Sequence, residues 1–202
     1  MNIIKKTLLI LGFVGLIFSQ EKRSFSFYYG SGFVNANIDG GYSQMVQGNY
    51  FGISKNIGIL FFNTPFNVGL QFANRGGQQS INLNDFVLPG NPPTEENILF
   101  DYEAEFLDLW INATINIGNN SFYLGPVYSM NLSSTMDDLI LPEIYDVDVS
   151  MFDIKEGNLG LMLGTSWHLF RLVGLSLETY QGLENNDKQR LSSYNLKLSI
   201  GL

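Results

Sequence analysis

The C-terminal stretch of the chain alternates strictly between apolar residues and small or polar ones. Residues 194–202 divide into an apolar set, Tyr194, Leu196, Leu198, Ile200 and Leu202, and a second set, Asn195, Lys197, Ser199 and Gly201. Successive side chains of a strand point to opposite faces of a sheet, so this pattern predicts a strand with one apolar and one polar face. At least five stretches share the pattern, and it is the main constraint on the fold.

The other predicted strands cover residues 66–75, 107–117, 122–132, 159–169 and 173–183, with two weaker candidates at 24–34 and about 47–57. The total is about eight strands. Residues 107–117 and 159–169 each run for eleven residues, close to the roughly 9–11 residues that a tilted strand needs to cross a bilayer. Pro126 cannot donate to a ladder, so we expect imperfect strand pairing around it.

The predicted connections differ in length. Short ones fall at 118–121 and 170–172 and a moderate one at 56–65, whereas long ones span 76–105 and 134–153. In an up-and-down order, short and long connections fall at opposite ends, as in outer-membrane barrels. We therefore predict an all-β fold, an antiparallel up-and-down transmembrane β-barrel of about eight strands. The alternative is a soluble exported barrel of lipocalin type, with its apolar faces turned inward around a small ligand.

The N-terminal residues have the organisation of a secretory signal. Lys5 and Lys6 precede an apolar or small run from Thr7 to Phe18, which is followed by Ser19 and Gln20. The run is shorter than the roughly 20 residues of a membrane-spanning helix. We predict a signal peptide at 1–20, a single barrel domain at 21–202, and a location in the cell outer membrane. Outer-membrane lipids, lipopolysaccharide and, during insertion, the barrel-assembly machinery are the partners expected there.

Composition excludes several classes of function. The chain has no cysteine, so it has no disulfide, thiolate metal site or thiol nucleophile. Its formal net charge is −8, and it becomes more negative when Lys5 and Lys6 leave with the signal. A chain this acidic has no basic surface for a phosphate backbone, so we expect no nucleic-acid partner.

Several short motifs lie on the predicted strands: Gly69-Leu70-Gln71-Phe72 leading to Arg75-Gly76, Phe106-Leu107-Asp108-Leu109, Tyr123-Leu124-Gly125-Pro126-Val127-Tyr128, Gly160-Leu161-Met162-Leu163-Gly164, Leu175-Ser176-Leu177-Glu178 and the closing strand. Together they resemble the PorT-type family of small outer-membrane β-barrels of Gram-negative bacteria. The resemblance implies the barrel fold and the outer-membrane location. Because the family includes a component linked to protein secretion, it also implies a possible secretion or surface partner.

Four charged residues lie on the predicted polar faces: Arg75, Asp108, Glu178 and Lys197. The interior of an eight-stranded barrel is only just wide enough for side chains, and buried charges need partners. Adjacent strands bring Arg75 near Asp108 and Glu178 near Lys197. We expect a structural salt-bridge network in a lumen largely filled by side chains, with a gated ion path or narrow channel as the alternative.

Other candidate sites have simpler explanations. His168 and Ser166 share a face and could form a hydrolytic pair, but the sequence marks neither an orienting acid nor an oxyanion site. We expect a packed histidine, no enzyme and no cofactor. The two long connections carry twelve of the chain's 19 acidic residues: Asp85, Glu95, Glu96, Asp101, Glu103, Glu105, Asp137, Asp138, Glu143, Asp146, Asp148 and Asp153. No calcium-loop spacing occurs among them, so we interpret them as solvated loops.

Aromatic residues gather near the end of the predicted barrel that carries the short connections. An interfacial girdle of a membrane barrel would explain them. The residues are Phe25, Phe27, Tyr29, Phe61, Phe62, Phe66, Phe122, Trp167 and Phe170.

Overall fold

The computed structural model describes residues 12, 25–38, 42–61, 64–82, 97–136, 157–170, 172–183 and 189–201. Apart from residue 12, the predicted signal peptide lies outside this set. The described residues form one antiparallel sheet of nine strands: β1 (Phe25–Ile38), β2 (Tyr42–Gln44), β3 (Val46–Phe61), β4 (Thr64–Asn82), β5 (Asn97–Ile117), β6 (Asn120–Met136), β7 (Gly157–His168), β8 (Val173–Gly182) and β9 (Gln189–Gly201).

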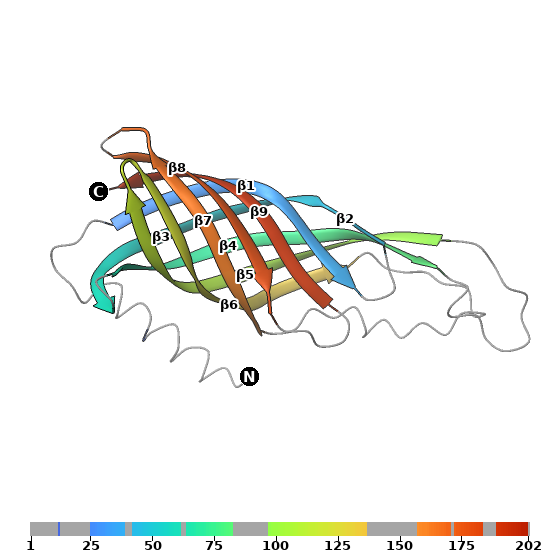
Figure 1. The fold of residues 1–202 in the computed structure, drawn as a ribbon. Helices are drawn as coiled ribbons and strands as arrows, with labels where there is room; N and C mark the ends of the chain where they lie inside the picture. The colour runs from blue at the N-terminus through green and yellow to red at the C-terminus, as the bar shows by residue number, and fades with distance from the viewer. Residues whose placement is uncertain are drawn as a thin grey trace, which may run out of the picture.

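The sheet closes on itself to form a barrel (Figure 1). Strand β1 pairs with β3, each strand from β3 to β8 pairs with the next one in the chain, and β9 pairs with β1. Strand β2 pairs with β4 beyond the end of β3, so β2 and β3 act as one interrupted strand. The prediction of an eight-stranded antiparallel up-and-down barrel is therefore confirmed. We call the end with the β3–β4, β5–β6 and β7–β8 connections the short-turn end, and the opposite end the long-loop end.

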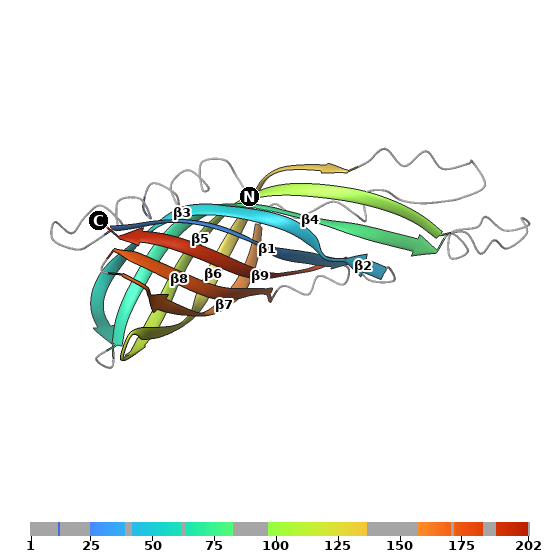
Figure 2. The same cartoon turned by 90° about the horizontal axis from the view of Figure 1, so that it is seen from above.

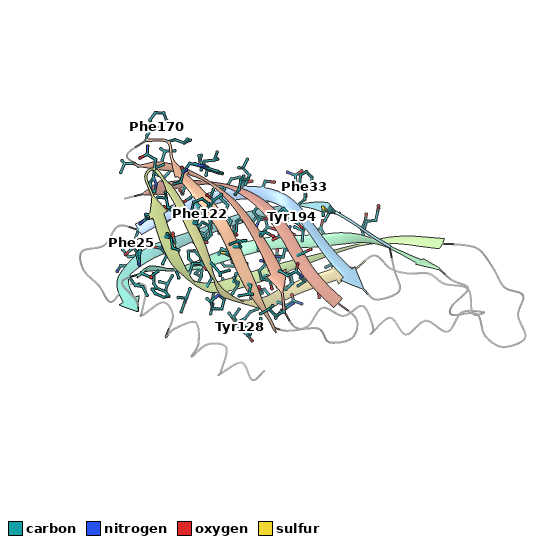
Figure 3. All side chains as sticks on the ribbon, in the orientation of Figure 1. Phe25, Phe33, Phe122, Tyr128, Phe170 and Tyr194 are labelled. Carbon is teal, nitrogen blue, oxygen red and sulfur yellow. The ribbon has the colours of Figure 1, made fainter. Side chains whose placement is uncertain are left out.

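On most strands the outward side chains are apolar, and the polar side chains face the lumen. On β9, Leu196, Leu198 and Ile200 are 48%, 48% and 50% exposed, whereas Asn195 and Lys197 are buried. Figure 3 shows Phe33, Phe122 and Tyr194 on the outside of the barrel wall. A soluble lipocalin-type barrel would need the opposite arrangement, because its apolar faces line the interior. The exterior is instead that of a membrane-spanning barrel.

Within the described residues, no helix is long and apolar enough to cross a bilayer, a finding that does not bear on spanning strands.

Three strands are longer than predicted. Strand β4 continues to Asn82, β5 begins at Asn97, and β6 continues to Met136. Figures 1 and 2 show β4 and β5 extending past the rest of the barrel at the long-loop end. The predicted long connections at 76–105 and 134–153 are wrong at these boundaries. Asp101, Glu103 and Glu105 consequently lie in β5 and not in a loop. Beyond the membrane both faces of a strand are solvated, so neither face has to be apolar. The backbone ladder therefore continues where the apolar alternation has ended.

Strand β3 shows why its sequence lacks a clean alternation. Tyr50 is buried in the lumen, whereas Lys55 is on the outward side, with its ammonium group 4.7 Å from the ring of Phe25. The register shifts after Asn56, where Gly58 has a φ of 88°, a conformation that glycine adopts without strain. The predicted connection at 56–65 is therefore mostly strand.

The β5–β6 ladder is interrupted near Pro126. It pairs Trp110 with Val127 and resumes with Ala113 opposite Leu124. This interruption agrees with the prediction of imperfect pairing around the proline.

Candidate functional site

Arg75 and Asp108 form a buried ion pair between the adjacent strands β4 and β5. Their side chains are 1% and 0% exposed. Both terminal nitrogens of Arg75 donate to the carboxylate, with Nη1 3.1 Å from Oδ1. Nη1 also donates to Ser129 Oγ at 3.3 Å. This two-point geometry is the strongest pairing available to an arginine and a carboxylate.

Three aromatic rings surround the Arg75 guanidinium group on the long-loop side. The guanidinium carbon lies 4.6 Å from the ring centre of Tyr180, 5.1 Å from that of Phe106 and 6.0 Å from that of Tyr50. A cation over aromatic faces is stabilised by the ring quadrupoles, most strongly where water is excluded. All three rings are buried, so this half of the lumen is packed.

Lys197 and Glu178 form the second buried ion pair, between the adjacent strands β9 and β8. The Lys197 Nζ atom is 2.5 Å from Glu178 Oε1 and 4.9 Å from the ring centre of Tyr28. Glu178 also accepts hydrogen bonds from Tyr123 OH at 3.2 Å and from Asn195 Nδ2 at 3.4 Å. Both oxygens of this carboxylate are therefore satisfied inside the barrel.

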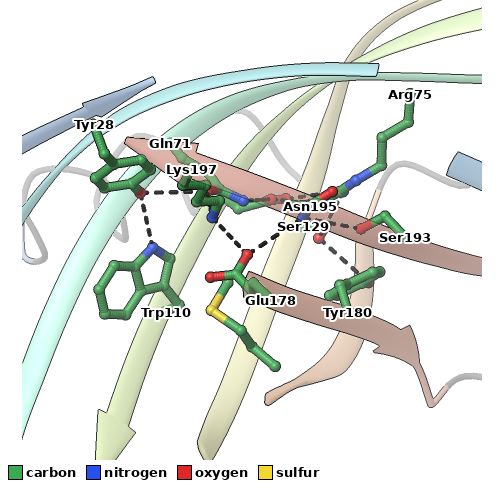
Figure 4. Close-up of polar contacts among 12 residues, drawn as sticks. Tyr28, Gln71, Arg75, Trp110, Ser129, Glu178, Tyr180, Ser193, Asn195 and Lys197 are labelled. Carbon is green, nitrogen blue, oxygen red and sulfur yellow. Dashed lines mark hydrogen bonds and ion pairs between the residues drawn. The ribbon is translucent and has the colours of Figure 1, made fainter. Parts of the chain in front are cut away.

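Gln71 joins the two ion pairs (Figure 4). Its Oε1 atom accepts from Lys197 Nζ at 2.7 Å and from Tyr28 OH at 3.3 Å, and its Nε2 atom donates to Asp108 Oδ2 at 2.6 Å. Trp110 Nε1 in turn donates to Tyr28 OH at 3.2 Å. We call the connected side chains of Arg75, Asp108, Gln71, Lys197 and Glu178 the lumen network. It carries two positive and two negative charges and crosses the barrel interior.

The structure thus brings the four sequence-predicted residues together in two pairs. Sequence reasoning did not identify Gln71, the residue that connects them, or Tyr28 and Trp110 beside it. Gln71 and Trp110 stand on the predicted polar faces, which is a usable signal. Tyr28 has no comparable signal, because the strand that carries it was only a weak candidate.

A cavity of about 330 Å³ occupies the lumen between the network and the short-turn end. Tyr28, Trp110, Glu178 and Lys197, which are labelled in Figure 4, line the cavity on the side of the network, and we call them its floor. Hydroxyl and amide side chains dominate its walls: Ser26, Ser54, Asn56, Asn67, Asn112, Thr114, Asn116, Ser121, Ser166, Ser176 and Ser199. The expectation of a largely filled lumen therefore describes the long-loop half, and it misses this cavity.

His168 and Ser166 line the cavity near the short-turn end. Glu178 is the carboxylate among the described residues that line the cavity. It is already bound by Lys197, Tyr123 and Asn195. A hydrolytic triad would need a carboxylate that orients the histidine. His168 and Ser166 therefore lie on the same cavity wall, but no carboxylate among the described lining residues is available there to orient the histidine.

The described acidic residues of the long-loop end are exposed on the outward side of β5. Asp101 accepts a hydrogen bond from Gln78 Nε2, and Glu105 accepts one from Ser133 Oγ, both at 3.0 Å. Within the described part of the chain, no three His, Cys, Asp or Glu side chains are grouped to hold a metal ion. The other predicted loop acids, at 85–96 and 137–153, lie outside the described residues.

Comparison with models of known protein families finds no match, and comparison with curated proteins finds none. Solved structures do match. Neisserial surface protein A is 13% identical, with a TM-score of 0.53 over 89% of this chain and 99% of that one. Ail, the attachment invasion locus protein of Yersinia pestis, is 11% identical, with a TM-score of 0.44 over 90% of this chain and all of that one.

The first of these similarities shows a shared fold. Closed eight-stranded barrels with an apolar exterior and a polar interior are membrane-spanning proteins. Such barrels occur in outer membranes, which agrees with the location predicted from the sequence. This chain is accordingly a small outer-membrane β-barrel.

Proposed function

We propose that the protein is a non-catalytic surface-interaction barrel, in which the lumen network stabilises the closed wall and the extended strands contact a partner outside the membrane. The observation that carries the proposal is the closed interior. A network of zero net charge spans the lumen, and the buried rings of Tyr50, Phe106 and Tyr180 pack on its long-loop side. A lumen that is closed across one half in this way favours a role for the outer surfaces over conduction through the barrel.

The surface best suited to a partner is the part of the sheet that projects at the long-loop end. Long loops of outer-membrane barrels face the cell exterior. There, Asp101, Glu103 and Glu105 alternate along β5 and lie exposed on one face. This face favours a partner with complementary basic groups, because complementary charge raises the rate of encounter and excludes wrong partners. A secretion component, suggested by the PorT-type resemblance, is one such class of partner.

Contacts with lipids follow from the same design. The outward leucines of β7, Leu159, Leu161 and Leu163, are 42%, 40% and 53% exposed and match the hydrocarbon region. Lipopolysaccharide and the barrel-assembly machinery belong to this proposal as partners of the wall during and after insertion.

Site-specific photo-crosslinking in intact cells tests the surface role. A crosslinker at Glu103 is expected to capture a protein, whereas one at Ile115, on the outward and membrane-embedded part of the same strand, is expected to capture lipid alone. The triple variant Asp101→Asn, Glu103→Gln, Glu105→Gln, with the crosslinker moved to Gln78, should lose the protein adduct while its gel mobility still shifts on heating. Equal protein adducts at Glu103 and Ile115 would contradict the proposal. A protein adduct from Gln78 that is as strong in the triple variant as in the unmodified protein would contradict it as well.

A further inference from the structure

The two halves of the lumen differ in character. On the long-loop side of the network, large buried side chains such as Phe106 and Tyr180 fill the interior. On the short-turn side, all eight barrel strands contribute small polar side chains around a cavity of about 330 Å³. The cavity therefore ends at the network and is reached from the short-turn end, which faces the periplasm in outer-membrane barrels.

The walls of the cavity suit an uncharged ligand. Its two charged residues, Glu178 and Lys197, are buried in the floor and neutralise each other at 2.5 Å. A charged ligand would therefore find no free countercharge among the described lining residues. An apolar ligand would displace water from the hydroxyl and amide groups of the walls and offer no hydrogen bonds in return, at a cost of about 1–3 kcal/mol for each group left unpaired, by protein mutational data.

Hydroxyl and amide side chains both donate and accept hydrogen bonds, and so do the hydroxyl groups of a sugar or polyol. Asn67 and Thr114 are already oriented by a mutual hydrogen bond of 2.8 Å, and Ser121 and Asn116 by one of 2.7 Å. The indole ring of Trp110 adds an apolar surface at the floor, where its Nε1 atom is fixed by Tyr28. Polar groups that are held in place before binding lose less entropy when a ligand arrives.

The size of the cavity is also suitable. Small-molecule sites measure about 300–1,000 Å³, and the cavity lies at the lower end of that range. At roughly 30 Å³ for each water molecule, it would hold on the order of ten waters or one sugar ring.

We propose that this cavity is a binding site for a small uncharged polyhydroxylated molecule, of the monosaccharide or cyclic polyol class, that enters from the periplasmic side. Because the network closes the far end, the ligand enters and leaves by the same opening and is held, not conducted. This binding activity is separate from the surface role and does not depend on it.

The chain contains two tryptophans, and they allow a specific test. Trp110 is buried at the cavity floor, whereas Trp167 lines the cavity beside Ser166 and His168, far from the floor, and pairs with Leu175 on β8. The variant Trp167→Phe keeps Trp110 as the sole fluorophore in the full chain refolded in detergent. Titration with D-glucose and with myo-inositol should change its fluorescence saturably, whereas D-glucuronate should not. The variant Trp110→Phe, which removes the indole ring from the floor and leaves Trp167 as the reporter, should bind the two neutral probes more weakly, and D-glucuronate should again cause no saturable change.

A matched pair of blocking variants on β8 completes the test. Ser176→Phe places a ring in the cavity, whereas Leu177→Phe places one on the lipid-facing side. In the Trp167→Phe background, the first should weaken binding at least tenfold, equivalent to about 1.4 kcal/mol, and the second should leave it unchanged. If Ser176→Phe does not fold, isothermal titration of the unmodified protein with the same neutral probes decides. If neither D-glucose nor myo-inositol binds saturably, the cavity holds water alone and the proposal is overturned.

Discussion

At the scale of single residues, the lumen network depends on each charge keeping its partner. Glu178 and Lys197 are 7% and 4% exposed, so neither is stabilised by bulk water when the other is removed. Removal of one member of a buried ion pair leaves an uncompensated charge, and this usually costs more stability than replacement of both members by apolar groups.

We therefore expect Glu178→Gln to lower the free energy of unfolding by about 3–5 kcal/mol. The double variant Glu178→Gln, Lys197→Met should recover a large part of that loss, because it removes the isolated charge. Urea unfolding in lipid vesicles, followed by the heat-dependent gel shift, measures both. Glu103→Gln, an exposed position on β5, is the control and should stay within about 0.5 kcal/mol of the unmodified protein. A single variant as stable as the double one would contradict this account.

At the scale of strands, glycines make room for the large lumen side chains of neighbouring strands. A Cβ atom at Gly164 would lie 2.3 Å from Tyr123 Cζ, and one at Gly69 would lie 2.1 Å from Trp110 Cζ2. Both are directly paired cross-strand positions, Gly164 with Tyr123 and Gly69 with Trp110. Alternation of small and large side chains is a common way to fill a small barrel.

Gly164→Ala should consequently displace Tyr123 and weaken its hydrogen bond to Glu178, which is 3.2 Å long. We expect a loss of about 1–3 kcal/mol in unfolding free energy, typical of overpacking. In a Tyr123→Leu background the same substitution should cost much less, since the clashing ring is absent. Urea unfolding of the four proteins gives the coupling energy. Fully additive effects would show that the two residues do not interact.

The strands also show what could be predicted from the sequence. Alternation identified the lumen side of Gln71, Arg75, Asp108, Glu178 and Lys197, because apolar and polar faces must separate in a membrane barrel. It could not supply the register. Asp108 is directly opposite Gln71, and Asn195 is directly opposite Glu178, so both ion pairs are diagonal. The predicted lengths of β4 and β5 were too short for a related reason. Both strands extend into water, where no apolar face is required.

At the scale of the whole molecule, the lumen has two closures in series. The first is the lumen network, and the second is the packing of Tyr50, Phe106 and Tyr180 around Arg75. The cavity at the short-turn end was not predictable, because it depends on how the summed side-chain volumes fill the interior. It makes half of the lumen accessible to solutes without making a pore.

These closures lead to a prediction for planar bilayers, where the unmodified protein should carry no steady current. Glu178→Gln alone should also remain closed, because the aromatic packing behind the network is untouched. Arg75→Ala combined with Tyr180→Ala removes the centre of that packing and leaves Asp108 without its arginine, so water should enter and intermittent currents should appear. The triple acidic variant at the long-loop end, which lies outside the lumen, is the control for insertion. A steady current through the unmodified protein would favour the narrow-channel alternative, since ions would then pass a network that keeps all its partners.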